Sequence, residues 1–151
     1  MDIREYLLSE PQTGIIRPVD THEWDKPGDP RELDVREMDI ITRATWRQLS
    51  YAMVPGTDAP GKEPDMVWSQ PRSNAAMIVL CTHYRSGEKA GERVFKDGDV
   101  DMLLHLPGQK HEAVIQRLLY ACTDINFLSG DTAKVAAKNS KSTRKSGSSS
   151  K

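Results

Sequence analysis

Residues 111–128, HEAVIQRLLYACTDINFL, carry the strongest structural signal in the chain. Apolar side chains recur there at intervals of three and four, which is the spacing of one face of an α-helix. That face is formed by Val114, Leu118, Ala121 and Ile125, and is widened by Ile115, Leu119 and Cys122. A helix with so wide an apolar face is typical of the centre of a core. The pattern predicts a central helix that Ser129 and Gly130 end.

Two further helices are predicted upstream of it. Residues 73–84, SNAAMIVLCTHY, form the most apolar run, and its Ala, Met and Leu favour helix over strand, with Ser73 as the N-cap. A helix over 40–53 follows from an apolar stripe that includes Ile41 and Leu49, with Asp39 as its N-cap. Short helices are expected at 2–9 and at 98–106, the latter capped by Asp97.

A β-hairpin is predicted between the helices expected at 2–9 and 40–53. Residues 13–24 alternate loosely and include Pro18, which restricts any strand there to a sheet edge. Residues 26–30, KPGDP, form a turn, and a second strand follows at 31–37. Residues 54–71 hold four of the nine prolines and are predicted to be a long loop, of the kind that is often functional.

The predicted fold class is therefore α+β and predominantly helical. A small N-terminal β-hairpin packs on a cluster of about four helices, within a domain at 1–130. The predicted core contains Ile41, Leu49, Met77, Leu80, Leu103, Leu118, Leu119 and Ile125.

A basic C-terminal tail is predicted at 131–151. This segment holds six basic side chains and one acidic, whereas residues 1–130 hold 15 basic and 21 acidic. Its last fourteen residues contain no aliphatic or aromatic side chain, so we expect disorder there. A solubilising role is favoured over nucleic-acid binding because no aromatic residue is available for stacking on bases.

Composition and motifs argue against several function classes. No apolar run approaches the roughly 20 residues of a membrane span, and no signal peptide is visible. Cys81 and Cys122 are too few for a disulfide scaffold and read as core residues in a cytoplasmic protein. GxGxxG, P-loop and GxSxG motifs are absent from the sequence, so no enzyme and no cofactor is predicted.

Metal binding is likewise not predicted. The acidic residues Asp97, Asp99 and Asp101 lack the Gly and Glu that an EF-hand loop needs at positions 6 and 12. The four histidines lack the HExxH spacing; they are His22, His83, His105 and His111.

Large aromatic side chains are the main candidates for partner binding. Trp46, Tyr51 and Trp68 lie near the predicted loop in a chain with only 6% aromatic residues. Such side chains often serve as anchors in interfaces, although a core role is the common alternative.

The order of these pieces resembles the small tail assembly chaperones of long-tailed, siphovirus-type bacteriophages. In that family a "VREL"-like strand precedes a helix, a "lF-x-DEDVeaL" segment precedes the last helix, and that helix closes with "LNGLs". The corresponding segments here are VREM at 35–38, FKDGDVDML at 95–103 and INFLS at 125–129. Phe127 departs from the small residue that the family has after Asn126. The resemblance covers roughly residues 15–140.

The resemblance implies a protein that is not an enzyme. Such chaperones coat the tape measure protein in the host cytoplasm, help recruit tail tube subunits and are absent from the mature virion. Self-association along the tape measure protein is expected, with no membrane contact. Two alternatives stay open: a structural head–tail connector or tail-completion protein, and a nucleic-acid-binding regulator that uses the basic tail.

Chaperones of this family are often made in two forms, the longer one by a −1 ribosomal frameshift. Ala137, Lys138 and Asn139 are compatible with the slippery heptamer A-AAA-AAC, read as GCA-AAA-AAC. This site follows the predicted domain, so a slip there would change only the tail.

Overall fold

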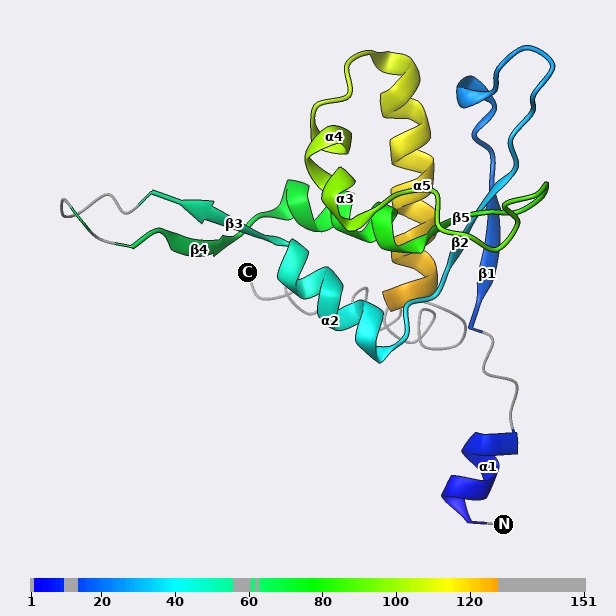
Figure 1. Ribbon diagram of the computed structural model, residues 1–151, viewed down its shortest axis with the longest axis horizontal. Coiled ribbons are helices and arrows are strands. Elements are labelled where there is room, and N and C mark those ends of the chain that lie inside the picture. Colours follow the sequence, from blue (N-terminus) through cyan, green and yellow to red (C-terminus); the bar gives the residue numbers. More distant parts are fainter. Residues whose placement is uncertain (1, 10–13, 56–60, 62, 128–151) are drawn as a thin grey trace, which may run out of the picture.

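The computed structural model describes residues 2–9, 14–55, 61 and 63–127, and it has the predicted α+β, helix-rich fold (Figure 1). At the centre of the fold, the long helix α5 (Gln109–Phe127) packs against α3 (Gln70–Cys81). A three-stranded antiparallel sheet contacts α5, and α2 (Ile40–Leu49) and α4 (Val100–Leu104) contact α3. The predicted tail at 131–151 lies outside the described residues.

The three-stranded sheet confirms the predicted hairpin. Strand β1 (Ile16–Val19) pairs antiparallel with β2 (Leu33–Arg36), and β1 is an edge strand, as Pro18 requires. The connection includes the 3₁₀ turn η1 (His22–Trp24) and a tight turn in which Gly28 has a φ of 79°, a conformation that glycine adopts without strain.

The third strand, β5 (Thr82–Tyr84), was not predicted. It pairs with β2, so the helix predicted at 73–84 ends at Cys81. The helix also begins earlier than predicted, at Gln70. Its N-cap is Ser69, whose side chain accepts a hydrogen bond from the Arg72 N–H, and Ser73 is buried inside the helix.

The helix predicted over 40–53 is likewise shorter. Asp39 is its N-cap as predicted, and Oδ1 of Asp39 accepts a hydrogen bond of 2.7 Å from the Thr42 N–H. The helix ends at Leu49, and the next residues form β3 (Tyr51–Val54). β3 pairs antiparallel with β4 (Asp65–Trp68), so the predicted loop at 54–71 contains a strand.

The two short helices also differ in detail from the prediction. The segment predicted at 98–106 is the 3₁₀ turn η2 (Asp97–Asp99) followed by α4. Asp97 does not cap it: its Oδ1 accepts a hydrogen bond from Arg93, whereas Asp99 accepts one from the Lys96 N–H. The N-terminal helix α1 (Ile3–Ser9) forms as expected, buries no residue and lies apart from the other elements (Figure 1).

The core is built mainly from α3 and α5. The predicted core residues Met77, Leu80, Leu103, Leu118 and Ile125 are buried, and Leu49 and Leu119 are half-buried against them. Ile41 contradicts the prediction because it is 78% exposed. The helix α2 turns Trp46 and Leu49 toward the core, so the face that carries Ile41 points outward.

We expect Asp39→Ala to lower the free energy of unfolding by about 1 kcal/mol, the usual loss for an N-cap. The hydrogen bond from the Thr42 N–H holds the pKa of Asp39 below its ordinary value. The stabilisation is therefore present above the ordinary pKa and is lost as the pH falls through the lowered one. Urea unfolding at pH 7 measures the loss, and Asp39→Asn, which keeps an oxygen acceptor, is the control. Equal losses in both variants would contradict the capping role.

Candidate functional site

The structure brings together the three aromatic residues that the sequence singled out. Trp46 comes from α2, Tyr51 from β3 and Trp68 from β4. The ring of Trp68 lies 5.6 Å from that of Trp46 and 5.5 Å from that of Tyr51, and both pairs are edge-to-face. Such pairs stabilise beyond the area they bury. Phe127, at the end of α5, joins the cluster with its ring 5.4 Å from Trp46.

The members of this aromatic cluster have different roles. Trp46 is half-buried, and its indole N–H donates a 3.0 Å hydrogen bond to the carbonyl of Ser73, so it anchors α2 to α3. Tyr51 and Trp68 are about 40% exposed and form a directly opposed pair on β3 and β4. Phe127 is exposed to a similar extent, at 39%. The part of the cluster that a partner can reach is therefore Tyr51 and Trp68 on the strands, with Phe127 at the end of α5.

The strands β3 and β4 form an apolar hairpin, defined here as residues 51–54 and 65–68. It projects from the body as an arm (Figure 1). Beyond Tyr51 and Trp68, its exposed large apolar side chains are Met53, Val54, Met66 and Val67. Met53 and Met66 are directly opposed in the register and are 67% and 58% exposed. Because side chains alternate along a strand, Met53 and Met66 share a face with Tyr51 and Trp68, and exposed apolar surface of this kind is typical of interaction sites.

The backbone of the apolar hairpin adds to this surface. Its sheet has two strands only, so within the part of the chain that the structure describes each strand has one edge without a neighbouring strand. An open edge presents backbone N–H and C=O groups that another chain can pair with. The hairpin thus offers apolar side chains and hydrogen-bonding edges together.

Sequence reasoning missed Met53, Val54, Met66 and Val67 as site residues. The apolar spacing places YAMV (51–54) at the end of a helix, and the prolines place DMVW (65–68) in a loop. Two short runs rich in strand formers on either side of a Pro- and Gly-rich connection are nevertheless a hairpin signal. The aromatic residues at their ends, Tyr51 and Trp68, were the part of the signal that stood out.

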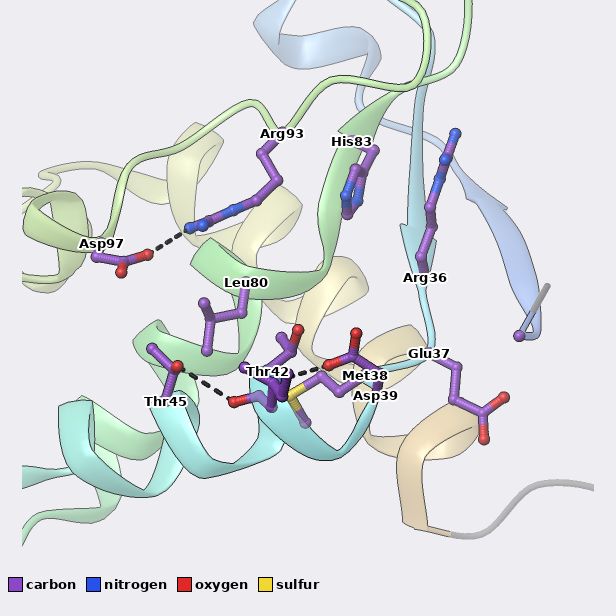
Figure 2. A pocket seen from close by; sticks show the side chains of 12 residues that line it. Arg36, Glu37, Met38, Asp39, Thr42, Thr45, Leu80, His83, Arg93 and Asp97 are labelled. Atoms are coloured by element: carbon purple, nitrogen blue, oxygen red, sulfur yellow. Dashed lines mark hydrogen bonds and ion pairs between the residues drawn. The ribbon is translucent and has the colours of Figure 1, made fainter. Parts of the chain in front are cut away.

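A second concave region is a groove of about 430 Å³ at the ends of β2 and α3 and the start of α2 (Figure 2). Its polar groups are largely engaged within the fold. Arg93 donates to Asp97 and to the carbonyl of Val79, and Glu37 accepts from the Ile15 N–H. Burial lowers the pKa of His83, which favours its neutral form. We find no nucleophile paired with a base among the residues lining this groove.

The two cysteines are buried and free, as core residues should be. A hydrogen bond with Cys81, together with burial, raises the pKa of the Cys122 thiol well above its ordinary value. The Cys122 sulfur therefore stays protonated at neutral pH and is a poor nucleophile.

Comparison with known proteins adds no relative: no family model, curated protein or solved structure matches this chain. Within the described residues, none of the helices has both the length and the apolar character needed to cross a bilayer. The predicted frameshift residues Ala137, Lys138 and Asn139 lie outside the described residues.

Proposed function

We propose that this chain is a tail assembly chaperone of a long-tailed bacteriophage. It coats the tape measure protein in the host cytoplasm, helps recruit tail tube subunits and is absent from the mature virion. The resemblance of the segments at 35–38, 95–103 and 125–129 to that family supports the proposal. The observation that carries it is the apolar hairpin, an exposed binding surface on a well-packed body.

The chemistry of the apolar hairpin suits a long apolar helix as its partner. A tape measure protein needs its apolar stripe covered until the tail tube closes around it. Methionine side chains are flexible and polarisable, so the opposed pair Met53 and Met66 can adapt to successive segments of different sequence. The rigid rings of Tyr51 and Trp68 supply fixed contact area beside them.

Weak individual contacts are sufficient for this role. Many copies bound along one tape measure protein gain avidity, so each hairpin can bind reversibly and leave when the tube assembles. The open strand edges of the hairpin also allow neighbouring copies to pair, which agrees with the expected self-association.

The test is a double variant of the hairpin, Met53→Ser with Met66→Ser. Both side chains are exposed, so we expect the fold to remain and the apolar contact to be lost. Co-purification with the tape measure protein should fall about tenfold or more, since each hot-spot side chain in an interface contributes 2 kcal/mol or more. Trp46 is left intact because its hydrogen bond to Ser73 makes it part of the body.

Met102→Ser is the matched control, because Met102 is a methionine on α4 that is 44% exposed. It should co-purify as the unaltered chain does. Undiminished co-purification of the double variant, with its circular dichroism unchanged, would remove the apolar hairpin as the binding surface.

A further inference from the structure

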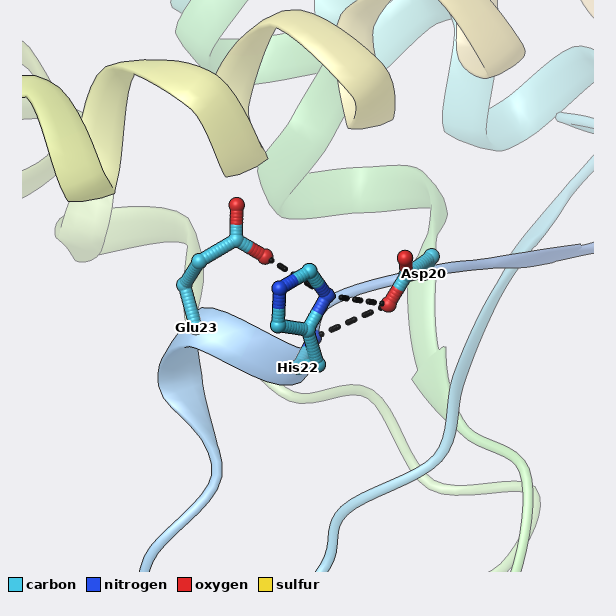
Figure 3. A group of neighbouring side chains, drawn as sticks. All are labelled: Asp20, His22 and Glu23. Carbon is cyan, nitrogen blue, oxygen red and sulfur yellow. Dashed lines mark hydrogen bonds and ion pairs between the residues drawn. The ribbon is translucent and has the colours of Figure 1, made fainter.

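Asp20, His22 and Glu23 gather where β1 leads into the turn η1 (Figure 3). Oδ1 of Asp20 lies 2.8 Å from Nδ1 of His22, and Oε1 of Glu23 lies 3.1 Å from the same nitrogen. Two carboxylate oxygens from different residues therefore converge on one imidazole nitrogen. His22 and Glu23 are the first two residues of the 3₁₀ turn η1, and Asp20 precedes His22 by two residues.

Arg117 of α5 holds the two carboxylates in this arrangement. One guanidinium nitrogen lies 3.2 Å from Oδ2 of Asp20, and the other pairs with Oε2 of Glu23. Arg117 thus engages Oδ2 of Asp20 and Oε2 of Glu23. The other oxygen of each carboxylate, Oδ1 of Asp20 and Oε1 of Glu23, stays directed at His22. Metal-binding carboxylates are commonly oriented by such outer hydrogen bonds.

One atom of this cluster lacks a hydrogen-bonding partner. The Nδ1 of His22 carries at most one proton, which Asp20 Oδ1 is positioned to accept. Oε1 of Glu23 is shielded from solvent and has no described hydrogen-bond donor, and its contact within the cluster is with Nδ1 of His22 at 3.1 Å. A buried carboxylate oxygen without a donor is costly, and a cation placed among the three atoms would satisfy it.

We propose that Oδ1 of Asp20, Nδ1 of His22 and Oε1 of Glu23 bind one divalent cation of the zinc class. Zinc accepts imidazole nitrogen and carboxylate oxygen as ligands, and a site with three protein ligands leaves the fourth position to water. Zinc bonds of about 2.0–2.2 Å at tetrahedral angles place the ligand atoms about 3.4 Å apart. The two separations from Nδ1 of His22, 2.8 and 3.1 Å, must open by a few tenths of an ångström, and all three ligand atoms already lie within 4.8 Å of one another.

The donor set and the charge both favour such an ion. The imidazole nitrogen selects zinc, nickel or copper over magnesium and calcium, which prefer oxygen ligands alone. The carboxylates of Asp20 and Glu23 carry two negative charges, and Arg117 cancels one of them. Because His22 and Asp20 have side chains more than 60% exposed, an ion can enter from solvent without opening the fold.

The proposal is tested by titrating the full-length, untagged chain with zinc chloride in a calorimeter. We expect one zinc ion per chain, not displaced by excess magnesium. His22→Gln and Asp20→Asn should each weaken zinc binding about tenfold or more, with circular dichroism confirming that both variants fold. The matched control is His105→Gln, which removes an exposed histidine outside the cluster and should bind zinc unchanged.

Failure of the unaltered chain to bind zinc would overturn the proposal, as would undiminished binding by both His22→Gln and Asp20→Asn. Equal loss in His105→Gln would place the ion elsewhere and would overturn it too. Cys81 and Cys122 are present in every variant, so they cannot produce a difference between the cluster variants and the control.

Discussion

We expect Leu118→Ala to lower the free energy of unfolding by about 2–5 kcal/mol, the range for truncating a buried leucine. Leu118 is 0% exposed at the middle of α5 and belongs to the buried core cluster that α5 shares with α3. Removing three methyl-group-sized carbons there loses their transfer free energy and leaves a cavity. The cavity can collapse little because the core cluster around it is close-packed, and its large members, such as Ile78 and Ile125, are fully buried.

Guanidinium chloride unfolding of both chains measures this loss. Tyr120→Ala is the matched control, since Tyr120 lies two residues further along α5 and is 74% exposed. The control should change the free energy of unfolding by less than about 0.5 kcal/mol. A loss below about 1 kcal/mol in Leu118→Ala would mean that this face of α5 does not form the core.

The central helix, the first hairpin and one helix cap were predictable because each has a distinct pattern in the sequence. The helix α5 repeats its apolar spacing from Val114 to Ile125, about three turns, and a short segment cannot imitate that. The hairpin of β1 and β2 was predictable from its turn chemistry, where Gly28 and the flanking prolines leave few alternatives. Asp39 was identified as a cap because a short acidic side chain preceded an apolar-periodic run.

The short strands were not predictable by the same means. Tyr51–Val54 continues the stripe of α2 in sequence, and only its pairing with Asp65–Trp68 shows that the helix has ended. In α3 every residue from Ala75 to Cys81 is buried, so the segment has no polar face whose end could mark the start of β5. Ile41 failed as a core residue because α2 turns a neighbouring face inward.

The candidate sites also combine features that the sequence predicts with features that depend on contacts between distant segments. The aromatic cluster was foreseeable from the rarity of its residues, but the exposure of Tyr51 and Trp68 follows from a strand pairing. The cluster around His22 depends on Arg117, which is more than ninety residues away in the chain. No local spacing rule reports such a contact.

Asn126 is a further residue whose role only tertiary structure reveals. It is buried near the end of α5, and its Oδ1 accepts a 2.8 Å hydrogen bond from the Met38 N–H. Its amide nitrogen donates to the carbonyl of Cys122 at 2.8 Å and lies 3.5 Å from the sulfur of Cys81. One side chain thus links the segment between β2 and α2 to both central helices.

Asn126→Ala should therefore lower the free energy of unfolding by about 1–3 kcal/mol, because the buried Met38 N–H loses its acceptor. Guanidinium chloride unfolding measures the loss, and hydrogen exchange should show faster exchange at the Met38 amide in particular. Gln116→Ala is the control, since it removes an exposed amide from the same helix and should change stability by less than about 0.5 kcal/mol. Unchanged protection of the Met38 amide in Asn126→Ala would show that another group accepts its hydrogen bond and that Asn126 does not hold this junction.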